Sequence, residues 1–361
     1  MLPTPKPSIL NISSYIPGKA ADDPDRDFIK LSSNENPYGA NPLAVAAFNA
    51  NNNNLHRYPD GAANNLRKKI AEKNNIPAEQ ILCGAGSDEL IGLLVHAYAG
   101  AGDEVLYSQY GFLMYNIYAN ASGATPVAAA ETNLTTDVDA LLAAVTPRTK
   151  IVFVANPNNP TGSYISTAEL KRLRTNLPEN VILALDSAYA EYVEKPDYNA
   201  GEELVAGSNN VVMLRTFSKI YGLAALRIGW MYAPENIIDS LNRIRSPFNT
   251  SQPSQTAVIA ALEDTNFVPQ QRELNRKNRT ELCNKLQALG VTPLPSEGNF
   301  LLVDFGTDTK AKKVLHELEN RYIFVRSVNS YGLYKYLRIT VGTEKENAAL
   351  IAALQEILDE L

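Results

Sequence analysis

The sequence predicts an α/β fold in which a mostly parallel central sheet is covered by helices. From residue 64 onward, short runs rich in apolar and β-branched residues alternate with helical segments. These runs are apolar throughout, which is typical of strands buried on both faces of a parallel sheet. The chain has 361 residues, 45% of them hydrophobic, which is enough for one large domain and a smaller one. The strand-like runs of this part are 103–107, 125–130, 150–156, 181–189 and 210–217.

The pattern changes after a polar, proline-containing stretch at 245–255. A long charged helical run follows at 269–290, and the strands after it are fewer and more separated from the helices. This arrangement is expected of a smaller α+β domain. Its segments are strand-like 299–305, helical 310–320, strand-like 322–328 and 337–342, and a final amphipathic helix.

The first residues are rich in Pro, Ser and Asn and show little periodicity, so they predict an extended arm. We therefore expect an N-terminal arm at 1–35, a large α/β domain that binds the cofactor at 36–250 and a small α+β domain at 251–361.

Composition narrows the classes of function. With 33 Lys plus Arg against 39 Asp plus Glu, the net charge is -6, which disfavours nucleic acid or an anionic membrane as a partner. Cys83 and Cys283 have no metal-ligand spacing and the three histidines are scattered, so we expect no metal site. No apolar window is long enough to span a membrane, and we expect a cytoplasmic protein.

The stretch GAGSDE at 84–89 follows a strand-like run and precedes an apolar helical one. The free N–H groups and dipole of a helix that begins here suit a phosphate. An ordinary Ser or Asp helix cap with flexible glycines is the more common explanation of such a stretch taken alone.

Two further polar stretches follow buried-type strands. NPNNPTG at 156–162 predicts a tightly shaped turn in which Asn159 faces a ligand, although it could be a turn and nothing more. Asp186 ends an apolar strand, with Tyr189 three residues later. A carboxylate there is costly unless it is paired, either as a cap of the next segment or with the cationic ring nitrogen of a pyridine cofactor.

Lys219 lies in an apolar stretch beside Phe217 and Ile220. Most lysines are solvated surface residues, but these flanks predict a desolvated amine with a lowered pKa, which can form Schiff bases. Ser218 and Arg227 add two phosphate-type ligands close by in the sequence. A phosphate site, an Asp for a pyridine nitrogen, an Asn and a Tyr for a ring hydroxyl and a Lys for an aldehyde together match pyridoxal 5′-phosphate.

Eight motifs also resemble, in order, those of the histidinol-phosphate aminotransferases, which are pyridoxal-phosphate enzymes of fold type I. The resemblance spans essentially the whole chain. The motifs are SSNENPYG (32–39), RYPDG (57–61), GAGSDE (84–89), NPNNPTG (156–162), DSAYAEY (186–192), TFSKIYGLAALRIGW (216–230), GNFLLV (298–303) and LRITVGT (337–343).

The resemblance implies a role for each matching residue. Lys219 would bind the cofactor aldehyde, Asp186 would pair with the ring nitrogen, and Asn159 and Tyr189 would hold the ring hydroxyl. Phe112, in preference to Tyr110, would stack on the ring. The phosphate would be held by Ala85, Gly86, Ser87, Ser218 and Arg227, and by Tyr58 from the partner subunit of a homodimer.

On the substrate side the resemblance implies two anion-binding arginines, Arg326 and Arg338, an arm tyrosine, Tyr15, that closes over the substrate, and a contact from Asn36. Two arginines suit two different anions presented in alternate half-reactions. The chain departs from the common pattern at Ala85, where many relatives have Asn, and in the loop 327–336, which is unusually rich in tyrosine and has Tyr334 where Pro is frequent. The second departure leaves substrate choice open.

We therefore expect an aminotransferase that exchanges an amino group between histidinol phosphate and 2-oxoglutarate in histidine biosynthesis. An aromatic amino acid aminotransferase could use the same residues. A phosphothreonine decarboxylase and a cofactor-binding protein without turnover are further alternatives.

Overall fold

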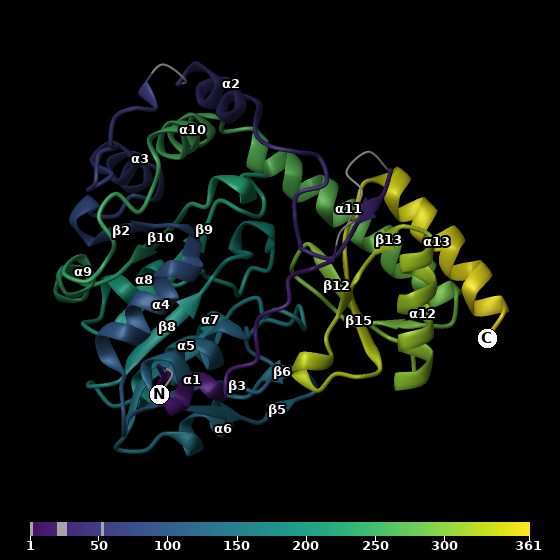
Figure 1. Cartoon of the computed structure of the whole chain (residues 1–361), viewed down its shortest axis with the longest axis horizontal. Helices are drawn as coiled ribbons and strands as arrows, with labels where there is room; N and C mark the ends of the chain where they lie inside the picture. Colours follow the sequence, from purple (N-terminus) through teal and green to yellow (C-terminus); the bar gives the residue numbers. More distant parts are fainter. Residues whose placement is uncertain (1–2, 20–26, 52–53) are drawn as a thin grey trace.

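The computed structural model describes residues 3–19, 27–51 and 54–361. A seven-stranded sheet lies at the centre of its larger part (Figure 1). Neighbouring strands are parallel except β10, which is antiparallel to both of its neighbours. The strand order is β2 (Ile81–Gly84), β10 (Gly229–Tyr232), β9 (Val211–Thr216), β8 (Ile182–Asp186), β7 (Thr149–Ala155), β3 (Glu104–Ser108) and β4 (Thr125–Ala129).

Helices bury both faces of this sheet. Successive residues of a strand point to opposite faces, so Val152 and Val154 of β7 enter one core whereas Ile151 and Phe153 enter the other. The expected α/β class is confirmed. The first core is covered by α3 (Asn64–Asn74), α6 (Val138–Ala144), α7 (Thr167–Asn176), α8 (Glu202–Ala206) and α10 (Gln252–Glu263), and the second by α4 (Gly86–Tyr98), α5 (Met114–Ser122) and α9 (Glu235–Asn242).

A smaller antiparallel sheet follows in the order β11 (Thr292–Pro293), β12 (Phe300–Asp304), β15 (Tyr336–Thr340) and β14 (Arg326–Ser327). Its core contains apolar side chains from α11 (Phe267–Ala288), α12 (Asp308–Asn320) and α13 (Glu344–Asp359). Thr343 and Glu346 form a capping box that begins α13.

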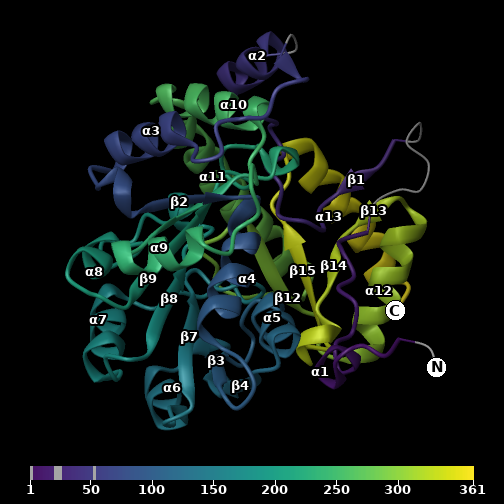
Figure 2. The same ribbon diagram turned by 60° about the vertical axis from the view of Figure 1, so that its left-hand side comes forward.

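The arm contacts both the large and the small part of the molecule. Its short helix α1 (Pro7–Leu10) packs beside α5, and β1 (Ile29–Lys30) pairs in parallel with β13 (Ile323–Phe324) (Figure 2). Residues 1–2 and 20–26 of the expected arm lie outside the described residues. The remaining elements are α2 (Pro42–Ala50), the hairpin β5 (Glu131–Thr132) and β6 (Thr135–Thr136), and the 3₁₀ turns η2 (Ala78–Gln80), η3 (Ala190–Tyr192), η4 (Ala224–Leu226) and η5 (Asn329–Tyr331).

The expected domain boundary near residue 250 places α10 in the small domain, whereas its buried residues Ala257, Val258 and Ala261 join the core of the large sheet. Helix α11 then runs from that core to the small one: Val268 packs against the first, and Leu282 belongs to the second. We therefore propose that the change of domain falls within α11 rather than before α10.

Candidate active site

A cavity of about 470 Å³ lies where the carboxyl ends of β7, β8 and β9 meet the small sheet and the arm. This edge of an open α/β sheet is where ligands bind. Most of the predicted site residues line it: Tyr15, Gly86, Ser87, Phe112, Asn159, Asp186, Tyr189, Ser218, Lys219, Arg227, Arg326 and Arg338.

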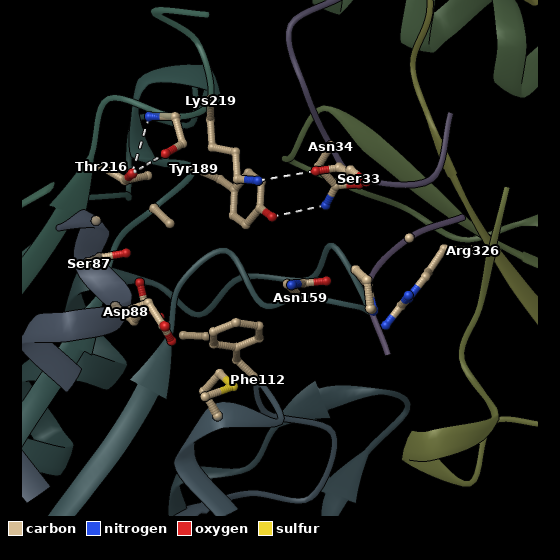
Figure 3. A pocket seen from close by; sticks show the side chains of 18 of the residues that line it. Ser33, Asn34, Ser87, Asp88, Phe112, Asn159, Tyr189, Thr216, Lys219 and Arg326 are labelled. Carbon is tan, nitrogen blue, oxygen red and sulfur yellow. Dashed lines mark hydrogen bonds between the residues drawn. The ribbon is translucent and has the colours of Figure 1, made fainter. Parts of the chain in front are cut away.

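The topology explains why residues far apart in sequence meet there. Asp186 is the last residue of β8, and Asn159 and Lys219 lie in the loops that follow β7 and β9. Ser87 lies in the first turn of α4, directly after β2. Because these strands run in the same direction, their carboxyl ends share one edge of the sheet. Figure 3 shows Lys219, Tyr189 and Asn159 around one space, with Phe112 and Ser87 at its border.

Lys219 is the buried amine expected from the sequence. Its Nζ donates to the carbonyl oxygen of Ser33 at 3.3 Å and lies 5.7 Å from the centre of the Tyr189 ring. Burial lowers the pKa of Lys219 to about 8, and the positive charge of Arg338 acts in the same direction. A neutral amine, which is the reactive form, is therefore accessible close to neutral pH.

Asp186 presents one carboxylate oxygen to this cavity. Burial raises its pKa to about 6. The hydroxyl of Tyr115, which donates to Oδ2 at 2.7 Å, and to a smaller extent the backbone N–H of Ala188 oppose this shift. The other oxygen, Oδ1, is buried and has no hydrogen-bond partner among the described residues. A protonated pyridine nitrogen is a donor that fits this oxygen.

The phosphate end of the site depends on a close approach between Gly86 and Arg227. Gly86 has φ +83°, and a Cβ at this position would lie 2.5 Å from Nη2 of Arg227. That nitrogen donates to the carbonyl oxygen of Ala85 at 3.4 Å. Together with the free N–H groups at the start of α4, the guanidinium makes this corner suitable for a phosphate.

The opposite end of the cavity carries the two arginines. Arg338, on β15, donates from Nη1 to Oδ1 of Asn159 at 2.5 Å and from Nη2 to the carbonyl oxygen of Ser32 at 2.7 Å. Its Nε is buried and has no hydrogen-bond partner among the described residues. Arg326, on β14, donates to the carbonyl oxygen of Ile16 at 2.6 Å and lies 5.6 Å from the ring of Tyr15.

Three predicted residues do not line the cavity. Ala85 is adjacent to it and contributes its backbone, whereas Tyr58 is 81% exposed and stacks on Phe248 with ring centres 4.5 Å apart. Asn36 also lies outside the cavity, and its amide donates to the carbonyl oxygen of Ile220 and to the side chain of Gln271.

Asn34 lies at the cavity in its place. Its amide donates to the Tyr189 hydroxyl at 2.9 Å, and its φ of 55° turns the chain before Asn36. The motif at 32–39 marked this region but not the turn that selects one asparagine. Tyr115 was also missed, because nothing in the sequence connects it with Asp186. The other lining residues that were not predicted are Pro17, Gly18, Ser32, Ser33, Asp88, Met114, Ala155, Pro157, Ala188 and Thr216.

Among the described residues, no group of three or more His, Cys, Asp and Glu side chains could hold a metal ion. The donors present fit pyridoxal phosphate instead: an amine for the aldehyde, a buried acceptor for the ring nitrogen and a cationic corner for the phosphate. Such chemistry at the carboxyl edge of a mostly parallel sheet defines the class of protein, a pyridoxal-phosphate-dependent enzyme.

Comparisons with known proteins agree with this class. The family model for aminotransferases of class I and II matches residues 26–354. The chain is 49% identical over 362 residues to a histidinol-phosphate aminotransferase of Rhodopseudomonas palustris and 49% identical over 358 residues to one of Paramagnetospirillum magneticum, each match covering 99% of both chains. The solved structure of histidinol-phosphate aminotransferase from Sinorhizobium meliloti in complex with pyridoxal-5′-phosphate superposes with a TM-score of 0.91 at 28% identity, covering 100% of this chain and 99% of that one.

The chain therefore belongs to the aminotransferase class I and II family and, within it, to the histidinol-phosphate aminotransferases. The expected enzyme class and cofactor are confirmed.

Proposed function

We propose that this protein transfers an amino group between histidinol phosphate and 2-oxoglutarate, as a step of histidine biosynthesis. The names of its relatives support histidinol phosphate as one of the two substrates. The observation that carries the proposal is that two arginines, Arg326 and Arg338, line the same cavity as Lys219. Histidinol phosphate carries a phosphate and glutamate carries carboxylates, and a guanidinium fork binds either anion.

When bound, pyridoxal phosphate supplies an aldehyde that captures the amino group and a ring that accepts electrons. Lys219 then acts as general base and acid at the substrate Cα, because its neutral amine can accept that proton and return it. Asp186 favours the protonated ring nitrogen through its unpaired Oδ1. We assign the ring hydroxyl to Asn159 and Tyr189, and the face of the ring to Phe112.

The phosphate of the cofactor would be held by Ala85, Gly86, Ser87, Ser218 and Arg227. The close approach of Arg227 to Gly86 supports this assignment. Ser218 is held by its neighbour, since the hydroxyls of Thr216 and Ser218 are 3.0 Å apart.

The test is a panel of amino donors with 2-oxoglutarate as acceptor. We expect kcat/KM for histidinol phosphate to exceed the values for histidinol and for phenylalanine. Arg326→Gln and Arg338→Gln should reduce kcat/KM for histidinol phosphate more than for histidinol, because only the former presents a phosphate. A comparable kcat/KM for phenylalanine and histidinol phosphate would overturn the proposal in favour of an aromatic amino acid aminotransferase.

The structure weakens one argument for that alternative. No residue of the tyrosine-rich loop 327–336, the departure that left substrate choice open, lines the cavity, and Tyr334 is 55% exposed. A phosphothreonine decarboxylase is distinguished in the same assay, because it would release carbon dioxide without consuming 2-oxoglutarate. Replacing Lys219 by Ala should abolish turnover, which also separates catalysis from simple cofactor binding.

We also propose a homodimer in which Tyr58 reaches the phosphate site of the partner. Exposed apolar side chains support this: Leu55 and Phe248 line the same groove as Tyr58, and Leu43, Val45 and Phe48 are exposed on α2. Apolar and aromatic patches of this kind are typical of interfaces.

We keep a cytoplasmic location as a proposal, supported by the free thiols of Cys83 and Cys283. Within the part of the chain that the structure describes, no helix is both long and apolar enough to cross a membrane.

A further inference from the structure

Tyr115 occupies a fully buried position directly behind the site. It lies in the first turn of α5, and its ring stacks on Phe153 with centres 4.4 Å apart and planes 5° apart. This packing leaves the ring little freedom. Its hydroxyl therefore has a fixed direction, and it donates to Oδ2 of Asp186 at 2.7 Å.

Because of this contact, the two carboxylate oxygens of Asp186 have different environments. Oδ2 is occupied by Tyr115, whereas Oδ1 is buried without a hydrogen-bond partner among the described residues. A buried carboxylate that keeps one oxygen free is costly unless another donor meets that oxygen. The ring nitrogen of the cofactor is that donor under the proposed function.

The same ring also supports a second residue of the site. Phe112, which borders the cavity, meets Tyr115 edge to face with centres 5.9 Å apart and planes 88° apart. One side chain thus contacts both the residue assigned to the ring nitrogen and the residue assigned to the ring face. A change at Tyr115 is expected to reach the cofactor through both.

We propose that Tyr115 is a positioning residue, which orients Asp186 so that one carboxylate oxygen faces the ring nitrogen of the cofactor. This inference rests on the proposed function of Asp186. Other titratable groups act on the pair from the neighbouring elements, namely Asp88 of α4, Tyr189 after β8, Lys219 after β9 and Tyr331 of η5. None of these groups replaces the donated hydrogen bond at Oδ2.

The experiment compares Tyr115→Phe with Tyr107→Phe. Tyr107 is a matched control, because it is buried in the same aromatic cluster and its hydroxyl accepts from Asn116 at 3.0 Å rather than contacting Asp186. Two quantities are measured: the dissociation constant of pyridoxal phosphate from the protein, and the pH at which the visible absorption band of the bound cofactor titrates.

We expect Tyr115→Phe to weaken cofactor binding by about tenfold, the effect of losing one hydrogen bond to a charged group. The visible band reports the proton on the nitrogen that joins Lys219 to the cofactor aldehyde. Its titration should shift toward higher pH by about one unit, because this nitrogen holds its proton more firmly when the ring nitrogen carries less positive charge. Tyr107→Phe should match the wild type in both measurements. A purely structural role would change the melting temperature and leave the titration of the band in place.

A double-mutant cycle with Asp186→Asn completes the test. If Tyr115 acts through Asp186, adding Tyr115→Phe to Asp186→Asn should change cofactor affinity no more than adding Tyr107→Phe does. The Asp186→Asn background contains no carboxylate that needs the Tyr115 hydroxyl. The comparison in this background can therefore be made even if the single Tyr115→Phe variant fails to fold. An equal loss in both backgrounds, or a Tyr115→Phe band that titrates as in Tyr107→Phe, would overturn the inference. Failure of the wild type to bind pyridoxal phosphate would instead refute the proposed function.

Discussion

Gly86→Ala tests the phosphate corner most directly. The added Cβ would lie 2.5 Å from Nη2 of Arg227, whereas ordinary contact begins at about 3.4 Å. Arg227 ends in a flexible guanidinium, so we expect it to move away rather than to disrupt the fold. The variant also adopts φ +83°, which costs about 1–2 kcal/mol for a residue with a Cβ.

A matched control separates these two effects. Gly102 has φ +92° and no heavy atom within 4 Å of the position that a Cβ would take, and it precedes β3 at the end of the sheet opposite the cavity. Gly102→Ala should therefore show the same backbone cost without displacing an arginine. The difference in cofactor affinity between the two variants should equal one lost charged hydrogen bond, about 1.5–3 kcal/mol, or about tenfold to about a hundredfold.

The assay is a titration of cofactor-free protein with pyridoxal phosphate, with melting temperatures measured in parallel. Gly86→Ala should melt close to Gly102→Ala but bind the cofactor more weakly. Equal affinities in the two variants would show that Arg227 does not hold the phosphate.

Three further predictions follow from the same contacts. Because the pKa of Lys219 is lowered to about 8, the rate at which cofactor-free protein captures pyridoxal phosphate should rise with pH around that value; a midpoint near the ordinary lysine value of 10.5 would contradict the burial argument. Burial raises the pKa of Asp186 from 3.8 to about 6, so the free energy of unfolding falls by on the order of 3 kcal/mol as pH rises through that range. Asp186→Asn should therefore raise the melting temperature of cofactor-free protein more at pH 8 than at pH 5. An increase in melting temperature that is the same at both pH values would refute this. Mixing Tyr58→Phe subunits with Lys219→Ala subunits should restore activity in heterodimers if sites are shared, since one site then retains both native residues, and no recovery would argue for sites built within one chain.

Much of the sheet could be predicted from the sequence because buried parallel strands are continuous apolar runs. The run at 150–156 became β7 and the run at 181–189 contains β8. Strand β10 was not expected: it has four residues and follows the Lys219 loop without a helix between, so it lacks the alternation that marked the others. Its antiparallel direction depends on its two neighbours, which only the folded chain brings together.

Some residues of the candidate site could likewise be predicted from the sequence and others could not. Lys219 and Asp186 were predictable because a charged residue in an apolar setting needs a partner. Asn34 could not be singled out within the motif at 32–39, because a single left-handed residue decides which side chain reaches Tyr189. Tyr115 gave no signal, since its contact with Asp186 spans 71 residues and depends on how α5 packs on the sheet. The boundary at 250 followed composition, which does not record that α10 returns to the large core.

The order in which the chain is synthesised bears on when this site can work. Apart from Tyr58, the groups assigned to the cofactor lie between residues 85 and 227, so they are synthesised before Arg338. Arg338 comes from the last strand, and the carbonyl of Ser32 that it contacts comes from the beginning of the chain. The substrate end of the cavity therefore forms only where the arm and the last strand meet, after the residues assigned to the cofactor have been synthesised.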